Sequence, residues 1–391
     1  MLAALILGVL LGADAAGYQL SARSETRSGS VGAAGVPSPS LDEQFNILAG
    51  VFGTSGRMRG DLSYAPSLTY DFRSKGDPDV LHRGFATGTY RLARGTTLSF
   101  GENVAYGHRD FRPLAPQPQD PAQALPAVVD PKLAQLGVVS YLQWGTGVGI
   151  DQALAPGIVL GVHGSYGASG GADADARRAL PLQHTASGSA RLAWVIDRRD
   201  SIGFSTGAVR TSTGPGISST ILSAGLGLDH RFSTATVGTL GAGASLSRDE
   251  TSGVTNVAPV RPTAAAGITH SELVFGRKVV SAARVAVDTA IDPFGGRTYS
   301  RVEGSLSVGF VPLRDLSFQV RGSGARGLTN RPELRNGLWQ VEGTSSYAFA
   351  RGMDVSLGCR TAFADAAATP QLQGTQWSAF LTFGFAYAGR I

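Results

Sequence analysis

Residues 377–387, WSAFLTFGFAY, carry the pattern that decides the fold class. Every second residue is apolar and mostly large, and the residues between them are mostly small or polar. The first set is Trp377, Ala379, Leu381, Phe383, Phe385 and Tyr387. Successive side chains of a β-strand point to opposite faces. This stretch is therefore predicted to be a strand with one apolar face and one small or polar face.

The same alternation recurs in the segments 301–310, 315–321 and 339–349. In water, such apolar faces would need a second sheet to cover them. In a wide transmembrane barrel the apolar face contacts lipid and the other face lines a lumen.

The composition also argues against a chain of ordinary soluble domains. With 391 residues the chain is long enough for two or three of them. However, only 16% of the residues are charged, whereas soluble domains carry about 25%. The net charge is +5, but the arginines are scattered rather than gathered in the basic patch that nucleic-acid binding requires. The single cysteine, Cys359, excludes an internal disulfide and a cysteine metal site. Its strand parity predicts that it points outward.

The connections between the expected strands alternate strictly in length, as they do between periplasmic turns and external loops. Short turns are expected at 53–57, 92–96, 153–157, 197–200, 233–235, 276–278, 312–315 and 350–352. Longer loops are expected at 27–41, 73–80, 111–136, 169–183, 210–219, 248–262, 292–298, 325–337 and 364–375. We therefore predict an all-β fold, a transmembrane antiparallel up-and-down β-barrel of about 18 strands with short periplasmic turns and longer external loops.

The N-terminal residues 1–15, MLAALILGVLLGADA, are apolar and end in Ala13-Asp14-Ala15. An apolar core followed by this pattern is typical of a secretory signal peptide. We expect residues 1–15 to be that peptide and residues 16–391 to form a single barrel domain in the bacterial outer membrane.

Aromatic residues recur near the short turns. Rings that are apolar but carry a polar tip favour the membrane–water boundary. The predicted lower membrane girdle is Phe52, Tyr90, Trp194, Phe232, Phe275, Phe310, Phe349 and Tyr387.

The same parity predicts a set of charged residues that line the lumen. These are Arg191, Arg284, Asp288, Arg301, Glu303, Arg321, Glu342, Asp354 and Arg360. A hydrated wall of mixed sign suits neutral or weakly anionic polar cargo. Alternatively, the charges pair across neighbouring strands and stabilise the wall.

The 111–136 segment is the longest loop and contains six prolines. It could fold inward as a constriction, cover the mouth as a lid, or remain a mobile external loop. The six histidines are dispersed without metal spacing. We therefore predict no catalytic residue, no metal, no cofactor and no enzyme.

The closing run through Leu381, Phe383, Phe385 and Tyr387 resembles the C-terminal assembly signal of bacterial outer-membrane proteins, although four residues follow it. More narrowly, the expected strand number, the glycine-, alanine- and arginine-rich composition and the segment 81–111 resemble the 18-stranded polysaccharide-export barrels of myxobacteria. This resemblance implies outer-membrane lipid, the barrel-assembly machinery and a periplasmic polysaccharide-export protein as partners, and no nucleic acid.

Three functions remain open from the sequence. The first is the outer-membrane exit pore for polysaccharide export. The second is a general or sugar-type diffusion porin. The third is a non-conducting barrel that acts in adhesion or as a scaffold.

Overall fold

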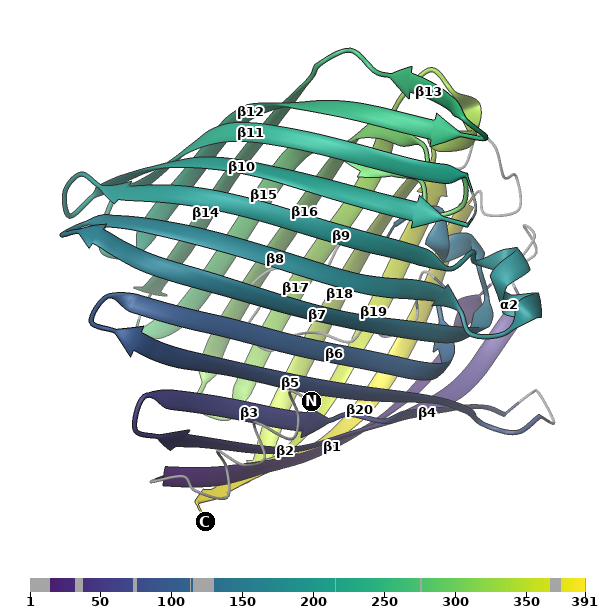
Figure 1. The fold of residues 1–391 in the computed structure, drawn as a ribbon. Coiled ribbons are helices and arrows are strands. Elements are labelled where there is room, and N and C mark those ends of the chain that lie inside the picture. Colours follow the sequence, from purple (N-terminus) through teal and green to yellow (C-terminus); the bar gives the residue numbers. More distant parts are fainter. Residues whose placement is uncertain are drawn as a thin grey trace.

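The computed structural model is a single antiparallel sheet that closes on itself (Figure 1). It describes residues 15–31, 38–72, 76–112, 114, 130–214, 216–274, 276–365 and 374–390. The first strand pairs with the last, from Gly17 opposite Arg390 to Ser30 opposite Trp377. This pairing closes the barrel.

Within the described residues the sheet contains 20 strands, and three short helical segments lie in its connections. The strands are β1 (Ala15–Val31), β2 (Ser38–Ser55), β3 (Met58–Tyr64), β4 (Ser67–Asp71), β5 (Asp79–Ala93), β6 (Thr96–Asp110), β7 (Val138–Ala155), β8 (Ile158–Gly171), β9 (Gln183–Val195), β10 (Asp200–Thr213), β11 (Ile217–Arg231), β12 (Thr236–Thr251), β13 (Val254–Val257), β14 (Arg261–Val274), β15 (Arg277–Ile291), β16 (Thr298–Leu313), β17 (Leu316–Leu328), β18 (Gly337–Ala350), β19 (Met353–Asp365) and β20 (Gly374–Arg390). The helical segments are η1 (Leu133–Gln135), α2 (Ala174–Ala179) and η2 (Pro332–Leu334).

The wall around the lumen consists of 18 strand positions, although the sheet contains 20 strands. β3 and β4 both pair with β2 on one side and β5 on the other, and they are interrupted only by Ala65 and Pro66. They therefore act as one wall strand. β13 pairs with β12 alone, in the connection to β14. The prediction of an all-β, antiparallel barrel of about 18 strands is confirmed.

Short turns lie at one end of the barrel and longer loops at the other (Figure 1). Two of the tight turns contain glycines with a positive φ, Gly157 at 79° and Gly352 at 76°. Glycine adopts this conformation without the penalty that a β-carbon imposes. The predicted alternation of connection lengths holds for most connections but is wrong at 210–219, where β10 and β11 extend into the expected loop and leave only residues 214–216 between them. The described chain begins and ends at the short-turn end.

Within the described strand pairs, the register shifts only beside four short turns. Elsewhere it assigns each paired residue to one face of the wall, because directly opposed residues share a face. One face carries large exposed apolar residues such as Phe383 and Leu357. The other carries Arg27 and Asp42, which bond to a loop that lies inside the ring. The first face is therefore the outside and the second the lumen. Cys359 lies on the outer face and is exposed, as its parity predicted.

The predicted girdle residues fall into three groups. Five lie on the outer face near the short turns: Tyr90, Trp194, Phe310, Phe349 and Tyr387. Phe232 directly follows β11 and is exposed beside His230. Phe275 lies outside the described residues.

Phe52 was predicted to belong to the girdle, but the register places it on the lumen face. It lies opposite Asp61 on β3 and opposite Gly17 on β1. The aromatic stands at the correct end of its strand, but its parity differs from that of Ile47 and Val51, which face outward. Position along the strand suggested the girdle, whereas the pleat determines the face.

The predicted signal peptide, residues 1–15, lies outside the described residues except for Ala15, the first residue of β1. In the portion that the structure describes, no helix is long and apolar enough to cross a membrane.

Candidate functional site

The lumen wall is the candidate site, and all nine charged residues predicted to line it lie on its interior face. Asp288 is opposite Arg301, and Glu342 lies between Arg321 and Arg360. The others follow by register: Arg191, Arg284, Glu303 and Asp354. That this wall forms a transport path remains a prediction.

A ladder of ion pairs crosses the wall between β18 and β1. The guanidinium of Arg360 lies 2.5 Å from a carboxylate oxygen of Glu342 and 2.8 Å from one of Glu25. It also lies 4.3 Å from the ring centre of Phe380. Glu25 is almost completely buried. Two carboxylates and an aromatic ring contact the Arg360 guanidinium on three sides. These contacts stabilise its positive charge, which is held away from bulk water.

A second cluster of charges lies closer to the end of the barrel that carries the long loops. Arg27 bonds to Asp42 at 2.6 Å and to Asp110 at 3.3 Å. Arg112 bonds to Asp110 at 2.7 Å and to Asp42 at 3.4 Å. Nearby carboxylates raise the pKa of Arg112 above its usual range, despite an opposing effect of burial. Two cations and two anions therefore neutralise each other inside the barrel.

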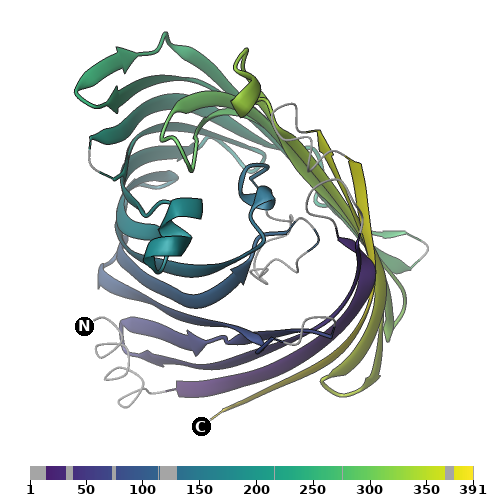
Figure 2. The same cartoon turned by 90° about the vertical axis from the view of Figure 1, so that its right-hand side faces the viewer.

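This cluster ties the long loop after β6 to the wall, and we call residues 111–137 the mouth loop. Arg27 donates a hydrogen bond of 3.1 Å to the carbonyl of Leu114. Leu114 is buried in an apolar cluster with Ala134 of the same loop and residues of the wall strands β18 and β19. The wall residues are Leu338, Ala362 and Ala364. Viewed along the barrel, the blue turn that carries η1 lies inside the ring (Figure 2).

A separate set of contacts holds the second described part of the mouth loop. Asp130 pairs with Arg301 of β16 at 3.4 Å, and Lys132 pairs with Asp292 at 2.9 Å. Arg301 also bonds to Glu303 at 3.0 Å. Burial raises the pKa of Asp130. Among the three alternatives raised by the sequence, the contacts of the described loop residues agree with inward folding.

The helix α2 also lies within the ring when the barrel is viewed along its axis (Figure 2). Its first turn is capped by the carboxylate of Asp173, which accepts a hydrogen bond of 2.8 Å from the backbone N–H of Ala176. Leu180, just after the helix, packs with Phe111 of the mouth loop and Tyr141 of β7. The mouth loop and the β8–β9 connection therefore support each other.

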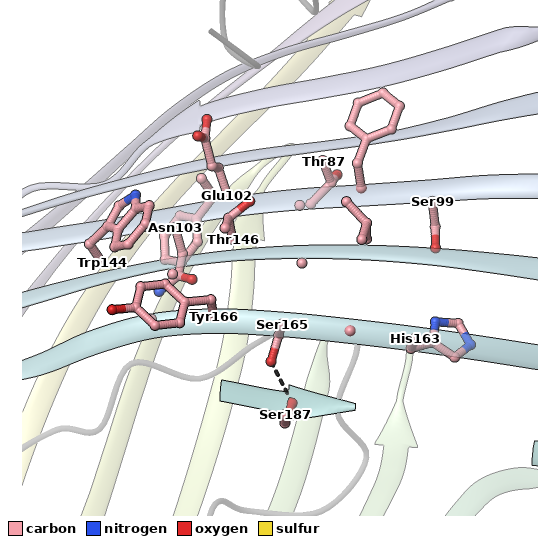
Figure 3. A pocket seen from close by; sticks show the side chains of 18 of the residues that line it. Thr87, Ser99, Glu102, Asn103, Trp144, Thr146, His163, Ser165, Tyr166 and Ser187 are labelled. Carbon is pink, nitrogen blue, oxygen red and sulfur yellow. Dashed lines mark hydrogen bonds between the residues drawn. The ribbon is translucent and has the colours of Figure 1, made fainter. Parts of the chain in front are cut away.

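The opposite side of the lumen, along β3 to β9, is lined by small and hydroxyl side chains. It encloses a cavity of about 960 Å³. Thr87, Ser99, Ser165 and Ser187 come to it from four different strands (Figure 3). The hydroxyls of Ser165 and Ser187 bond at 2.6 Å. A smaller hollow of about 440 Å³ is lined by the predicted residues Arg191, Arg284 and Asp288, together with Asp229.

The sequence did not reveal the partners that hold the predicted charges. Glu25, Arg27 and Asp42 were not among the predicted lumen residues, although strand parity along β1 and β2 could have identified them. Arg27 and Asp42 pair with each other across the β1–β2 hairpin, but the partner of Glu25 is far away in the chain, since Arg360 is 335 residues from it. The sequence also did not identify Phe85, which lies on the lumen face opposite Asn103. Across the described residues, no three His, Cys, Asp or Glu side chains gather as a metal site.

Comparison with known proteins adds a family and a set of similar barrels. A model of the EpsX exopolysaccharide export family matches residues 10–390. No curated protein matches the chain. Among solved structures, OpdK of Pseudomonas aeruginosa is 13% identical with a TM-score of 0.50, over 96% of this chain and 99% of that one. OccK2 (OpdF) of the same organism is 14% identical with a TM-score of 0.51, over 95% and 98%. These structures are similar in fold.

Proposed function

Because the chain belongs to the EpsX exopolysaccharide export family, we propose that a polysaccharide chain leaves the cell through this barrel with the help of a periplasmic export protein. The barrel is an outer-membrane export pore of that family, and its family and fold point to a transport channel rather than an enzyme. Residue-level roles, cargo and partner are our proposal. The family match across nearly the whole chain is the observation that carries it.

The lumen wall has the chemistry that a hydrated glycan chain requires. Serine and threonine hydroxyls both donate and accept hydrogen bonds, so they can exchange partners with sugar hydroxyls as the chain moves. Charges of both signs lie near each other, as in the pair of Arg360 with Glu25 and Glu342. Such pairing leaves a modest net field, which neither traps nor repels a weakly charged polymer.

We propose that the mouth loop narrows the path through its described residues, 111–112, 114 and 130–137. It is fixed to the wall at Arg112 and Leu114 on one side of the lumen and at Asp130 and Lys132 on the other. Polymers that are thicker than a single glycan chain would meet this loop. We propose that it acts as the constriction that selects an extended chain.

The two ends of the barrel suggest where a partner binds. At the short-turn end the connections are tight, for example the turn at Asp197, whose carboxylate accepts bonds from the backbone N–H groups of Arg199 and Asp200. A rim of short, fixed turns offers a regular docking surface to a periplasmic ring or tube. The apolar outer face contacts outer-membrane lipid, and the barrel-assembly machinery inserts it.

A deletion strain tests the export role. Loss of this chain should abolish cell-surface and secreted exopolysaccharide and leave polymer in the periplasm, and a plasmid copy should restore secretion. Quantification of sugar in the medium and in periplasmic extracts measures both. If secretion continues at the normal level in the deletion strain, the export role is rejected.

Two further measurements separate the alternatives. A diffusion porin would make small sugars and amino acids permeate liposomes quickly, and its loss would slow their uptake by cells without affecting polymer secretion. A scaffold barrel would show no conductance in planar bilayers, with or without its periplasmic partner. An export pore should pass current when the mouth loop is displaced.

A further inference from the structure

We propose that the lumen wall around Phe85 is a glycan-binding subsite, at which one pyranose ring stacks on the Phe85 ring and its hydroxyls bond to the polar side chains beside it. The inference rests on the proposed function, since it names a binding position for the same cargo. It goes further because it names the side chains that contact the sugar.

Phe85 is an apolar side chain exposed to an aqueous lumen. It shares the interior face with Ser63 on β3 and Asn103 on β6, and 41% of its surface is accessible. Burying a phenylalanine side chain stabilises a fold, and a ring exposed to this extent contributes only part of that stabilisation. On the outer face the same ring would contact lipid. An aromatic ring kept at this position is therefore poorly explained by stability and better explained by a ligand that covers it.

The polar groups around Phe85 match the rim of a sugar. Asn103 lies directly opposite Phe85, and Thr87 follows two residues along the same face of β5. Asp61 lies opposite Thr87 and pairs loosely with Arg59 at 3.7 Å. Both of these charged side chains remain substantially exposed, so they can bond to an arriving ligand.

A pyranose has an apolar face of C–H groups and a rim of hydroxyls. The C–H face packs on an aromatic ring, while the hydroxyls bond to carboxylate, amide and hydroxyl groups at the edges. Phe85, Asn103, Thr87 and Asp61 all line the cavity of about 960 Å³. A small number of polar groups around an apolar contact is the usual arrangement of a small-molecule site.

A glycine keeps the amide of Asn103 in position. A β-carbon on Gly145 would lie 2.6 Å from the side-chain oxygen of Asn103, which is too close. Any larger residue at position 145 would push the amide away from its place opposite Phe85. Several of the labelled side chains of this cavity, Asn103 among them, are visible in Figure 3.

The other lumen aromatics do not offer the same surface. Phe380 is 3% exposed and covered by Arg360. Tyr141 is buried under the mouth loop. Phe52 is exposed and faces the lumen, but its ring lies over Gly17 of β1 and does not line the cavity. Phe52 also lies opposite Asp61, but Asn103 and Thr87 lie beside Phe85 instead. Phe52 is therefore a control with the same side chain in the same lumen, without the amide and hydroxyl partners.

Titration calorimetry on the purified, folded barrel tests the subsite. The probe is a set of size-fractionated oligosaccharides cut from the exopolysaccharide that the source strain secretes. Phe85→Ala should weaken binding at least tenfold, and Phe85→Trp should keep or strengthen it because the larger ring retains the stacking surface. Asp61→Asn should weaken binding severalfold. Phe52→Ala should bind as the wild type does, and heat-modifiable migration confirms that each variant is folded.

Each other outcome contradicts the subsite. It is rejected if the wild type does not bind the oligosaccharides, if Phe85→Ala binds as tightly as the wild type, or if Phe52→Ala loses as much affinity as Phe85→Ala. The deletion strain separates this result from the export role. Lost secretion on deletion together with unchanged binding in Phe85→Ala would reject the subsite alone, whereas normal secretion on deletion would reject the export role alone.

Discussion

The two sides of the lumen differ in how their side chains are held. Along β16 to β20, β1 and β2, charged side chains are fixed to one another, as Arg360 is to Glu25 and Glu342. We call this side the charged arc. Along β3 to β9, apart from Asp110 at the mouth end of β6, the wall presents glycine, serine and threonine, and its charges are loosely paired, as Asp151 is with His163 at 3.5 Å. We call this side the open arc.

From this difference we infer that one side of the lumen wall anchors the mouth loop and the other side contacts the cargo. The charged arc carries the mouth loop, since Arg27 bonds to Leu114 and Arg301 bonds to Asp130. Side chains engaged in buried pairs have little capacity left for cargo. Side chains in the open arc, such as those of Asp151 and His163, are nearly half exposed and can exchange partners with a ligand. We therefore expect mutations in the charged arc to affect stability and the loop, and mutations in the open arc to affect the ligand.

The largest effect is expected at Asp42. Its carboxylate is 1% exposed and bonds to both Arg27 and Arg112. Asp42→Ala leaves both arginines with Asp110 as their shared carboxylate inside the barrel. Removing one member of a buried ion pair lowers the free energy of unfolding by about 3–5 kcal/mol. Thermal unfolding of the detergent-solubilised barrel, followed by circular dichroism, measures the loss.

The matched control is Asp151→Ala in the open arc. That carboxylate is 45% exposed, and a surface substitution of this kind changes stability by no more than about 0.5 kcal/mol. Equal losses from the two variants would show that the two arcs are not held differently.

Arg360 should give the next largest effect. Arg360→Ala leaves Glu25 buried without its cation and uncovers Phe380. We expect a loss of about 3 kcal/mol and a shift of the channel toward cation selectivity, because two carboxylates are no longer neutralised. Arg360→Lys should recover only part of the stability, since a lysine cannot bond to two carboxylates in the planar geometry of a guanidinium.

Unfolding temperature and the reversal potential in asymmetric salt measure the two effects. Arg191→Ala, an exposed arginine of the open arc, should change the reversal potential less and leave the unfolding temperature unchanged. A reversal potential that shifts equally in the two variants would contradict the comparison.

The sequence predicted the wall because strand periodicity is local. Each strand shows its two faces within about ten residues, and the connection lengths orient the barrel without any knowledge of contacts. The same periodicity placed Arg301, Glu342 and Arg360 on the lumen face. Phe52 shows the limit of such reasoning: it was assigned by its place near a turn, and the pleat put it on the other face.

The pairings that close the barrel and anchor the mouth loop could not be predicted, because they join residues that are distant in the chain. Nothing near Glu25 in the sequence indicates Arg360, and nothing in the proline-rich mouth loop indicates that Leu114 packs on Leu338. Closing the barrel brings β1 next to β20, and only then do these residues meet. The exposure of Phe85 likewise depends on the width of the lumen and on its small neighbours.

A smaller effect is expected from loosening the mouth loop. The double substitution Asp130→Asn with Lys132→Ala removes the pairs with Arg301 and Asp292, while Arg301 keeps Glu303. The cluster at Arg112 remains. We expect a severalfold higher and noisier single-channel conductance, with little change in unfolding temperature, because this end of the loop can leave the lumen.

The control for that experiment is a second ion pair at the mouth. Asp175 and Arg178 pair at 3.0 Å on α2, and both side chains are more than four-fifths exposed. Asp175→Asn with Arg178→Ala should leave the conductance at the wild-type value. A similar increase in both double variants would mean that the anchors to the charged arc do not hold the constriction.

The smallest effect is a difference in pH dependence between the two arcs. Burial raises the pKa of Asp130 above its ordinary value near 3.8, so the folded barrel binds this proton more tightly than the unfolded chain. The carboxylate therefore costs stability at neutral pH, and that cost disappears as the pH falls through the raised pKa. Asp197, in the turn after β9, has its pKa lowered by bonds from the backbone N–H groups of Arg199 and Asp200. Its contribution is present above the ordinary value and is lost as the pH falls toward the lowered pKa.

The two substitutions should consequently differ in sign. At pH 7, Asp130→Asn should unfold at the same temperature as the wild type or slightly higher, and the wild type should approach it in mildly acidic buffer. Asp197→Asn should unfold at a lower temperature at pH 7, and its difference from the wild type should shrink below pH 4. Unfolding temperatures of the three proteins between pH 3 and pH 8 measure this. If Asp130→Asn destabilises at pH 7, the pair with Arg301 contributes more than burial costs, and the mouth loop would then be held more firmly by this anchor than the charged-arc comparison assumes.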